Sequence, residues 1–285
     1  MEKLTINSKI ILNNKTKIPV IGFGVFRIPE GEEVVNAVKW ALEAGYRHID
    51  AAMIYKNEEG VGKAIRESGV PREEIFVTTK LWNTDQGYDS ALKAIDVSLK
   101  KLGLSYVDLY LVHWPTAGDA SKGESINKRG ETWRAMEEIY RSGKARAIGV
   151  SNYTITHLEE MRKYAQVPPA VNQVEFHPFL YQEELLNYCK KNGIAFEAHS
   201  PLVHGEKLDN EVISSIAKKH AKSGAQVLLR WSLQHGCIPI PKSTHKERIK
   251  ENIRVFDFEL SGEEMKQLNK LNQNLHLRSD PTNLK

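Results

Sequence analysis

The sequence predicts an α/β protein of the (β/α)8, or TIM-barrel, class with a short N-terminal β-hairpin. Apolar strand-like segments alternate with helical segments along the chain, and strands that are apolar on both faces indicate a parallel sheet covered by helices. Eight such units are counted, which favours a closed barrel over an open sheet. We expect residues 1–285 to form one domain, because single barrels run to about 250 residues and beyond.

The N-terminal hairpin is predicted from its turn. Two apolar segments, residues 5–12 and 18–24, flank Asn13, Asn14 and Lys15. Residues of these types are typical of a turn between two strands. Residues 21–24 also count as the first strand of the barrel.

The remaining elements follow from periodicity. Strand segments are short and apolar or β-branched, whereas helical segments repeat apolar residues every three to four positions, as Ala91, Ile95, Leu99 and Leu102 do. The predicted strands are residues 46–50, 75–80, 107–113, 144–150, 170–175, 194–199 and 238–241. The predicted helices are residues 34–44, 58–68, 90–102, 132–142, 155–164, 182–191, 210–221 and 225–235, with another beginning near Thr244 or His245. Residues 116–128 are rich in Gly and Ser and are predicted to form a loop.

Composition excludes several classes of protein. The net charge of +4 is small and scattered, so no nucleic-acid partner is expected, although it suits an anionic small molecule. Only Cys189 and Cys237 are present, which fits a reducing compartment without a disulfide framework. We expect no secretory signal and no membrane segment, and therefore a cytoplasmic protein. A monomer is also expected.

Four ionisable residues lie where three successive strands end. Asp50 ends one strand, Tyr55 is on the loop after it, Lys80 ends the next strand and His113 the one after. Singly, each has an ordinary explanation: a turn cap, a solvated strand end or a core histidine. Because the active site of a barrel lies at the C-terminal ends of its strands, the four together indicate one reactive pocket.

The chemistry of these groups favours carbonyl reduction. A neutral phenol is a weak acid at neutral pH, and we expect the Lys80 ammonium to lower the pKa of Tyr55. Asp50 would keep Lys80 protonated, and His113 would orient a carbonyl and share in proton transfer. None of the four can supply a hydride, so a cofactor is implied.

The same residues lie in segments that resemble the aldo-keto reductase superfamily. The matching segments, in order, are GYRHIDAAMIYKNEEGVG, IFVTTKLWN, YVDLYLVHWP, RAIGVSN, VNQVEFHP and IPKSTHKERIKEN. The sequence is most similar to short microbial members: glyoxal or methylglyoxal reductases, 2,5-diketo-D-gluconate reductases and prostaglandin F synthase-like reductases. The resemblance implies NADPH-dependent reduction of small aldehydes and ketones, with Tyr55 as general acid and Asp50, Lys80 and His113 completing a tetrad.

The resemblance also implies which residues contact the cofactor and the substrate. Arg248 and Asn252 are four apart and share one helix face, and Lys242 and Arg248 suit an adenosine 2′-phosphate, which favours NADPH. The implied cofactor residues are Gly24, Val25, Asp50, Ser151, Asn152, Gln173, His199, Ser200, Leu202, Lys242, Ser243, Arg248, Glu251 and Asn252. The implied substrate residues are Phe26, Tyr55, Trp82, His113 and Trp114, with residues 116–129 as a substrate-facing loop.

Three positions depart from the family pattern. His199 stands where Tyr or Trp usually stacks on the nicotinamide, Val25 where many members have Thr, and Phe26 where some have Trp. An imidazole offers less area and titrates near neutral pH, so we expect weaker or pH-dependent cofactor binding. The polar tail after Leu271 is predicted to be too short to wall off a long pocket.

Two other functions are kept open. A metal-dependent hydrolase barrel could use His48, Asp50, His113, His177 and His199 as ligands, although Lys80 beside Tyr55 fits it badly and we expect no metal. A non-catalytic NADPH-sensing subunit is the other alternative. The intact tetrad favours the reductase over both.

Overall fold

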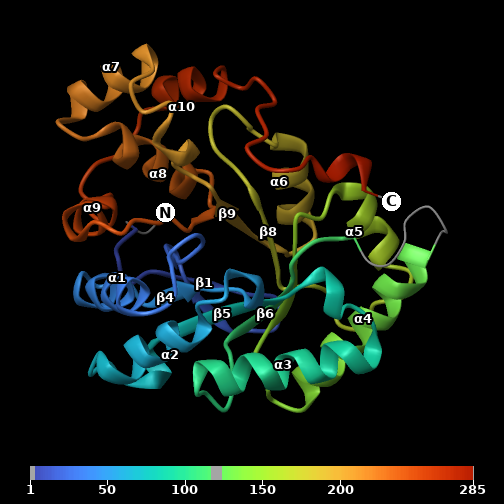
Figure 1. The fold of residues 1–285 in the computed structure, drawn as a ribbon. Coiled ribbons are helices and arrows are strands. Elements are labelled where there is room, and N and C mark those ends of the chain that lie inside the picture. The colour runs from blue at the N-terminus through green and yellow to red at the C-terminus, as the bar shows by residue number, and fades with distance from the viewer. Residues whose placement is uncertain (1–3, 117–123, 285) are drawn as a thin grey trace.

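The computed structural model describes residues 4–116 and 124–284, and within them eight parallel strands form the centre of the molecule (Figure 1). Each strand pairs with the next along the chain. The strands are β3 (Phe23–Gly24), β4 (His48–Asp50), β5 (Phe76–Leu81), β6 (Leu109–Val112), β7 (Ile148–Ser151), β8 (Val171–Glu175), β9 (Ala195–His199) and β10 (Ile238–Pro239). The predicted (β/α)8 architecture is confirmed.

Two backbone hydrogen bonds join the first and last strands of the sheet. Gly22 N–H donates to the Pro239 carbonyl and Gly24 N–H to the Pro241 carbonyl, both at 3.0 Å. Glycine allows this close approach, because a Cβ on Gly22 would lie 2.6 Å from His48 Nδ1. The curved sheet is therefore closed into a barrel at this seam.

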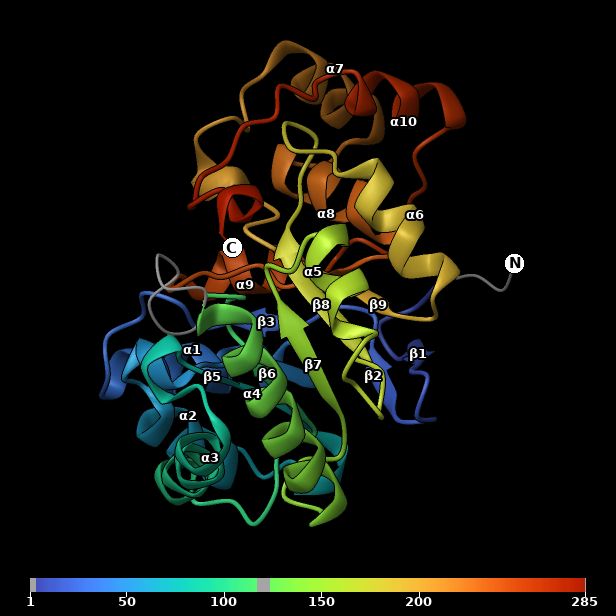
Figure 2. The ribbon, with the colours of Figure 1, turned by 90° about the vertical axis from the view of Figure 1, so that its right-hand side faces the viewer.

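Helices surround the barrel (Figures 1 and 2). In α3, for example, one face is buried and Gly103 ends the helix with a left-handed φ of 64°, as a glycine after a helix commonly does. The helices are α1 (Glu32–Glu43), α2 (Glu58–Glu67), α3 (Tyr88–Leu102), α4 (Glu124–Arg141), α5 (Ile155–Met161), α6 (Glu183–Lys191), α7 (Glu211–His220), α8 (Gly224–Gln234), α9 (Lys246–Asn252) and α10 (Gly262–Asn269). No helix in the described ranges is both long and apolar enough to cross a membrane.

Two helical regions differ from the predictions. The loop predicted for residues 116–128 is wrong from Glu124 onward, where α4 already begins, and residues 117–123 lie outside the described part of the chain. Tertiary contacts stabilise this polar first half: the Arg129 guanidinium donates to both carboxylate oxygens of Glu160 at 2.8 Å. Helix α10 was not predicted, although Ser261 and Glu264 form a capping box at its start.

The predicted N-terminal hairpin is present and closes one end of the barrel. Strands β1 (Lys9–Ile11) and β2 (Lys17–Pro19) are antiparallel. The amides of Asn13 and Asn14 in the turn donate to the carbonyls of Pro169 and Arg146, both at 2.9 Å, which precede β8 and β7. The hairpin thus lies across the N-terminal ends of the strands (Figure 2), and the opposite end is left for the site.

Candidate active site

A cavity of about 1060 Å³ opens at the C-terminal ends of the strands. Almost every residue expected to contact cofactor or substrate lines it. These are Gly24, Phe26, Asp50, Tyr55, Trp82, His113, Trp114, Asn152, Gln173, His199, Ser200, Leu202, Lys242, Ser243, Arg248, Glu251 and Asn252. Of the described residues predicted for the site, Val25, Lys80 and Ser151 are not in this lining, and they lie one layer behind it. The described part of the predicted substrate-facing loop, Thr116 and residues 127–129, is also absent from the lining.

Lys80 is the centre of the buried layer. Its ammonium donates to Asp50 Oδ1 at 2.6 Å, to the Ala51 carbonyl at 2.9 Å and to the Tyr55 hydroxyl at 3.3 Å. The side chain is fully buried, and Asp50 Oδ2 accepts a further bond of 2.8 Å from the Gln173 amide. Lys80 therefore connects the carboxylate to the phenol without itself reaching the cavity.

Burial and charge act on these groups in opposite directions. Burial is the largest single effect and lowers the pKa of Lys80, but the charge and hydrogen bond of Asp50, together with the other acidic groups nearby, outweigh it, so the net pKa is raised and the ammonium persists. Burial also raises the pKa of Tyr55, and the opposing charge of Lys80 does not overcome it. The expected lowering by Lys80 is therefore present but smaller than the effect of burial, so the net pKa of Tyr55 is raised and the phenol stays protonated.

His113 completes the group at the cavity wall. Its ring makes edge-on contacts with Tyr55 and Trp82, at centroid distances of 5.7 and 5.1 Å. Burial and the nearby Lys80 charge hold the pKa of His113 well below its usual range, so the imidazole is neutral. Its Nδ1 is buried without a hydrogen-bond partner in the described part of the chain. Phe26 contacts Tyr55 from the other side, with centroids 4.9 Å apart.

A series of hydrogen bonds connects Asn152, Ser151 and Gln173 at the base of the cavity. Asn152 adopts a left-handed φ of 62°, and its amide donates to the His113 carbonyl at 2.9 Å and to Ser151 Oγ at 3.1 Å. Ser151 in turn donates to the Gln173 carbonyl at 2.8 Å. Ser151 thus supports Asn152 from behind. Val25 is likewise fully buried, with its N–H bonded to the Asp50 carbonyl at 3.1 Å.

The pKa of His199 is lower than the sequence predicts. Its Nε2 lies 3.0 Å from Asn152 Oδ1 and its Nδ1 lies 3.2 Å from Ser200 Oγ. Burial lowers the pKa of His199 to about 4. The prediction that this imidazole titrates near neutral pH is therefore wrong, because the ring is already uncharged there.

The opposite end of the cavity is basic. Lys242 and Arg248 line it, and within the described residues neither side chain forms an ion pair. Ser243 is buried beside them, and its Oγ accepts the N–H of His245 at 3.1 Å. Helix α9 begins at Lys246, close to the predicted start. This end of the cavity can hold an anionic group.

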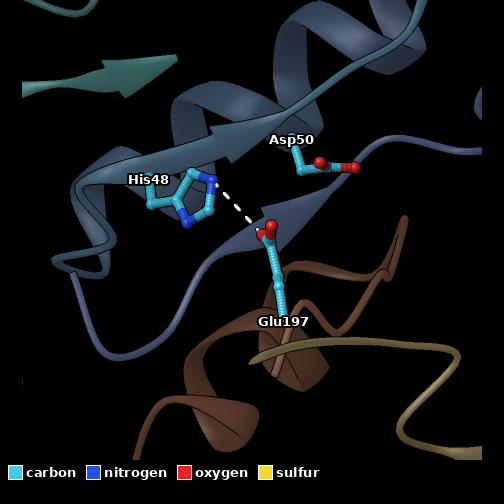
Figure 3. A group of neighbouring side chains, drawn as sticks. All are labelled: His48, Asp50 and Glu197. Atoms are coloured by element: carbon cyan, nitrogen blue, oxygen red, sulfur yellow. Dashed lines mark ion pairs between the residues drawn. The ribbon is translucent and has the colours of Figure 1, made fainter. Parts of the chain in front are cut away.

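One buried group in the described ranges has the residue types of a metal site. Ligand atoms of His48, Asp50 and Glu197 lie within 4.8 Å of one another, and Figure 3 shows Glu197 reaching from β9 toward His48 on β4, 3.6 Å away. Both oxygens of Asp50 are already engaged, one of them by the Lys80 ammonium. A metal cation there would be repelled by Lys80, so the group fits a metal poorly.

The ligand set of a hydrolase is not assembled either. His177 Nε2 bonds Glu175 at 3.0 Å, and His199 bonds Asn152 and Ser200. Of the five residues proposed as ligands, only His48 and Asp50 belong to the buried group. Burial instead raises the pKa of Glu197 to about 8 and lowers that of His48 to about 3, which makes both uncharged at neutral pH.

Glu197, Arg27 and Arg278 are charged or ionisable groups in or near the cavity that were not predicted from the sequence. Glu197 was not singled out, although it lies inside the barrel below Asp50. Arg27 and Arg278 both line the cavity, and the tail that carries Arg278 was predicted only to be short. A glutamate in an otherwise apolar strand was the available signal for Glu197. The sequence carried no local signal for the position of Arg278.

A closed (β/α)8 barrel with a buried Asp–Lys pair, a phenol and a neutral imidazole at its rim is a barrel enzyme equipped for proton transfer to a bound ligand. The particular class follows from comparison with known sequences. Residues 20–273 match the Aldo/keto reductase family, and the chain belongs to that family.

Individual relatives agree over almost the whole chain. It is 52% identical over 280 residues to the glyoxal reductase of Bacillus subtilis (strain 168), covering 98% of each chain. It is similar in structure to an aldo-keto reductase from a Medee basin deep-sea metagenome library, with a TM-score of 0.91, 48% identity and coverage of 97% and 99%. It is also similar to the Bombyx mori aldo-keto reductase in complex with NADP, with a TM-score of 0.89, 40% identity and coverage of 97% and 96%.

Proposed function

We propose that this protein reduces small aldehydes and ketones, of the glyoxal and methylglyoxal type and related carbonyls, to alcohols with NADPH. The observation that carries the proposal is the Asp50–Lys80–Tyr55 chain, with contacts of 2.6 and 3.3 Å, which ends at a cavity shared with His113. The glyoxal reductase and the NADP-bound relative support the substrate type and the cofactor.

The cavity residues fit such a cofactor. Polar amides of Asn152 and Gln173 lie at the end near Tyr55, His199 offers a ring face there, and two cations without ion pairs in the described residues lie at the other end. Asn152 and Gln173 would hold the carboxamide, and Lys242 and Arg248 the adenosine 2′-phosphate, which distinguishes NADPH from NADH. When bound, NADPH supplies the hydride.

Residues of the protein orient the carbonyl and supply the proton. The neutral imidazole of His113 donates an N–H to the substrate carbonyl and orients it. Tyr55 gives its proton to the oxygen as that oxygen gains charge. Lys80 stabilises the phenolate left behind, and Asp50 keeps Lys80 protonated and fixed in direction.

Tyr55→Phe tests the assignment with little change in shape. NADPH oxidation is followed with glyoxals, aromatic aldehydes, sugars and quinones, and we expect turnover of carbonyls to fall by at least 100-fold. Tyr140→Phe is the matched control, because Tyr140 is partly buried on α4 and is not in the cavity lining. Equal rates for wild type and Tyr55→Phe on every carbonyl would show that Tyr55 is not the general acid.

We also propose that residues 1–285 act as one domain, as a monomer, in the cytoplasm. Both cysteines are free and buried, which supports a reducing compartment. Size-exclusion chromatography with light scattering tests the monomer, and a particle of twice the chain mass would contradict it.

A further inference from the structure

Two arginines share one aromatic ring at the edge of the cavity. The guanidinium carbon of Arg278 lies 4.7 Å from the centre of the Phe26 ring, and that of Arg27 lies 5.3 Å from it. Both arginines line the cavity, and Phe26 itself contacts Tyr55. Two positive charges therefore flank the route to the proton donor.

Arg278 is held in place by bonds that fix the tail. The carboxylate of Glu175, at the end of β8, accepts the N–H of Leu277 at 2.8 Å and the N–H of Arg278 at 3.2 Å. The carbonyl of Phe179 accepts two further tail N–H groups, from Gln273 and Leu275. The position of Arg278 is thus determined by contacts across roughly a hundred residues of sequence and does not depend on the side chain alone.

The charge of this pair is not neutralised by neighbouring side chains. Among the described residues neither Arg27 nor Arg278 forms an ion pair, and the Arg278 guanidinium has one polar side-chain contact, 3.3 Å from His204 Nε2. Burial and the charge of Arg27 lower the pKa of Arg278. Glu175, the carboxylate whose charge opposes this lowering, is already bonded to backbone N–H groups and to His177. The site is therefore ready to accept an anion.

The position of Arg278 favours binding of an anionic group of the substrate over binding of an anionic group of the cofactor. Arg278 contacts Phe26, whose ring contacts Tyr55, and acts electrostatically on Tyr55, so it lies at the Tyr55 end of the cavity. The cations expected to bind the adenosine phosphate follow β10 and lie at α9, and Figure 1 shows α9 and the red C-terminal tail on different sides of the barrel.

We propose that Arg278, with Arg27 beside it, is a specificity-determining residue that binds an anionic group on the substrate. The preferred carbonyls would then be 2-oxo acids, aldehyde acids and other short carbonyl compounds bearing a carboxylate or phosphate. A guanidinium binds either anion through two parallel N–H donors. This inference rests on the proposed carbonyl reduction.

Matched substrates test the proposed anion site. One pair is 4-carboxybenzaldehyde and its methyl ester, and the other is a phosphate-bearing aldehyde and the same aldehyde with a free hydroxyl group in place of the phosphate. For Arg278→Gln we expect kcat/KM for the charged substrates to fall about 10- to 100-fold, mainly through KM, and to change less than about twofold for the neutral ones. Arg278→Lys should retain part of the preference. Arg162→Gln, on the exposed face of the molecule, controls for loss of one positive charge.

Three results would overturn the proposal. The first is a wild-type enzyme with equal kcat/KM for acid and ester. The second is an equal loss on charged and neutral substrates, which would indicate a structural role. The third is a weaker Kd for NADPH in Arg278→Gln with the acid preference intact, which would assign the guanidinium to the cofactor diphosphate.

A binding measurement separates this inference from the proposed function. Calorimetric titration of 4-methylbenzoate into the protein with NADP+ measures binding without turnover, because this carboxylate has no alcohol or aldehyde group to react. Weaker binding to Arg278→Gln than to wild type supports the anion site even if no carbonyl is reduced. Equal binding to both proteins refutes it even if reduction is observed.

Discussion

Glu197→Gln is expected to make the protein gain stability, relative to wild type, as the pH rises. Glu197 is fully buried inside the barrel, and neither carboxyl oxygen has a hydrogen-bond partner among the described residues. Burial and the charge of Asp50 raise its pKa from 4.5 to about 8. Folding therefore retains a proton that the unfolded chain would release.

The sign and size follow from linkage. A raised pKa means that the contribution of Glu197 is most favourable below pH ~4.5 and is lost as the pH rises toward about 8. Each pH unit in this window changes the free energy of unfolding by about 1.4 kcal/mol. Over the window the wild type should lose on the order of 4 kcal/mol through this group, and Glu197→Gln should not.

Urea unfolding of both proteins at pH 5, 6, 7 and 8 measures the difference. Glu32→Gln is the control, because its partner is Lys63, which lowers the pKa of Glu32 through a hydrogen bond and its charge and stays charged between pH 5 and 8. That contribution is present above pH ~4.5 and is lost only as the pH falls below that value, so its effect should be constant between pH 5 and 8. If the difference in free energy of unfolding between Glu197→Gln and wild type is also constant between pH 5 and 8, the reasoning is refuted.

Three further predictions concern the site and the barrel. Lys80→Met should abolish carbonyl reduction and reduce the free energy of unfolding by about 3–5 kcal/mol, because it leaves the buried Asp50 carboxylate unpaired. Adding Asp50→Asn should restore stability without activity, and carbonyl reduction by Lys80→Met alone would contradict the role of Lys80. Titration of His199 should not change the Kd for NADPH between pH 6 and 8, because this imidazole has a pKa of about 4, and His199→Tyr should bind NADPH more tightly. A tenfold change of Kd with pH in wild type that is absent in His199→Tyr, measured by fluorescence titration, would contradict this. Gly22→Ala should lower the free energy of unfolding by about 1–3 kcal/mol through overpacking at the seam of the barrel, whereas Gly262→Ala, with open space around it, should not; equal effects in urea unfolding would refute the seam argument.

The fold and the reactive centre were predictable because they depend on local patterns. Strand ends can be read from apolar runs, and the ends of parallel strands must meet at one rim. That is sufficient to bring Asp50, Tyr55, Lys80 and His113 together from three short segments. Strand lengths were less predictable: residues 144–150 suggested a long strand, and β7 begins at Ile148.

The features that were missed depend on contacts between distant segments. Arg278 reaches the cavity because Glu175, more than a hundred residues earlier, bonds the tail backbone. Glu197 meets His48 across the barrel interior, and no spacing along the chain encodes that meeting. The net rise in the pKa of Tyr55 was not predicted for a related reason: the sequence indicates the neighbouring Lys80 charge, which lowers this pKa, but does not indicate how completely the phenol is buried.

The raised pKa of Tyr55 places the effect of Lys80 in the transition state. The resting phenol is protonated, so it can donate whenever substrate is bound. As charge builds on its oxygen, an ammonium 3.3 Å away stabilises it by on the order of 5 kcal/mol at an effective dielectric constant of ~20.

It follows that kcat/KM for carbonyl reduction should not fall with pH through Tyr55 across the neutral range, whereas oxidation of the alcohol, which needs the phenolate, should rise with pH. Both profiles belong in the Glu197→Gln background, because Glu197 ionises near pH 8 and would change the charge around Lys80. A reduction rate in that background that falls through neutral pH, with no matching fall in cofactor binding, would mean that Tyr55 ionises in that range and that Lys80 acts on the resting phenol instead.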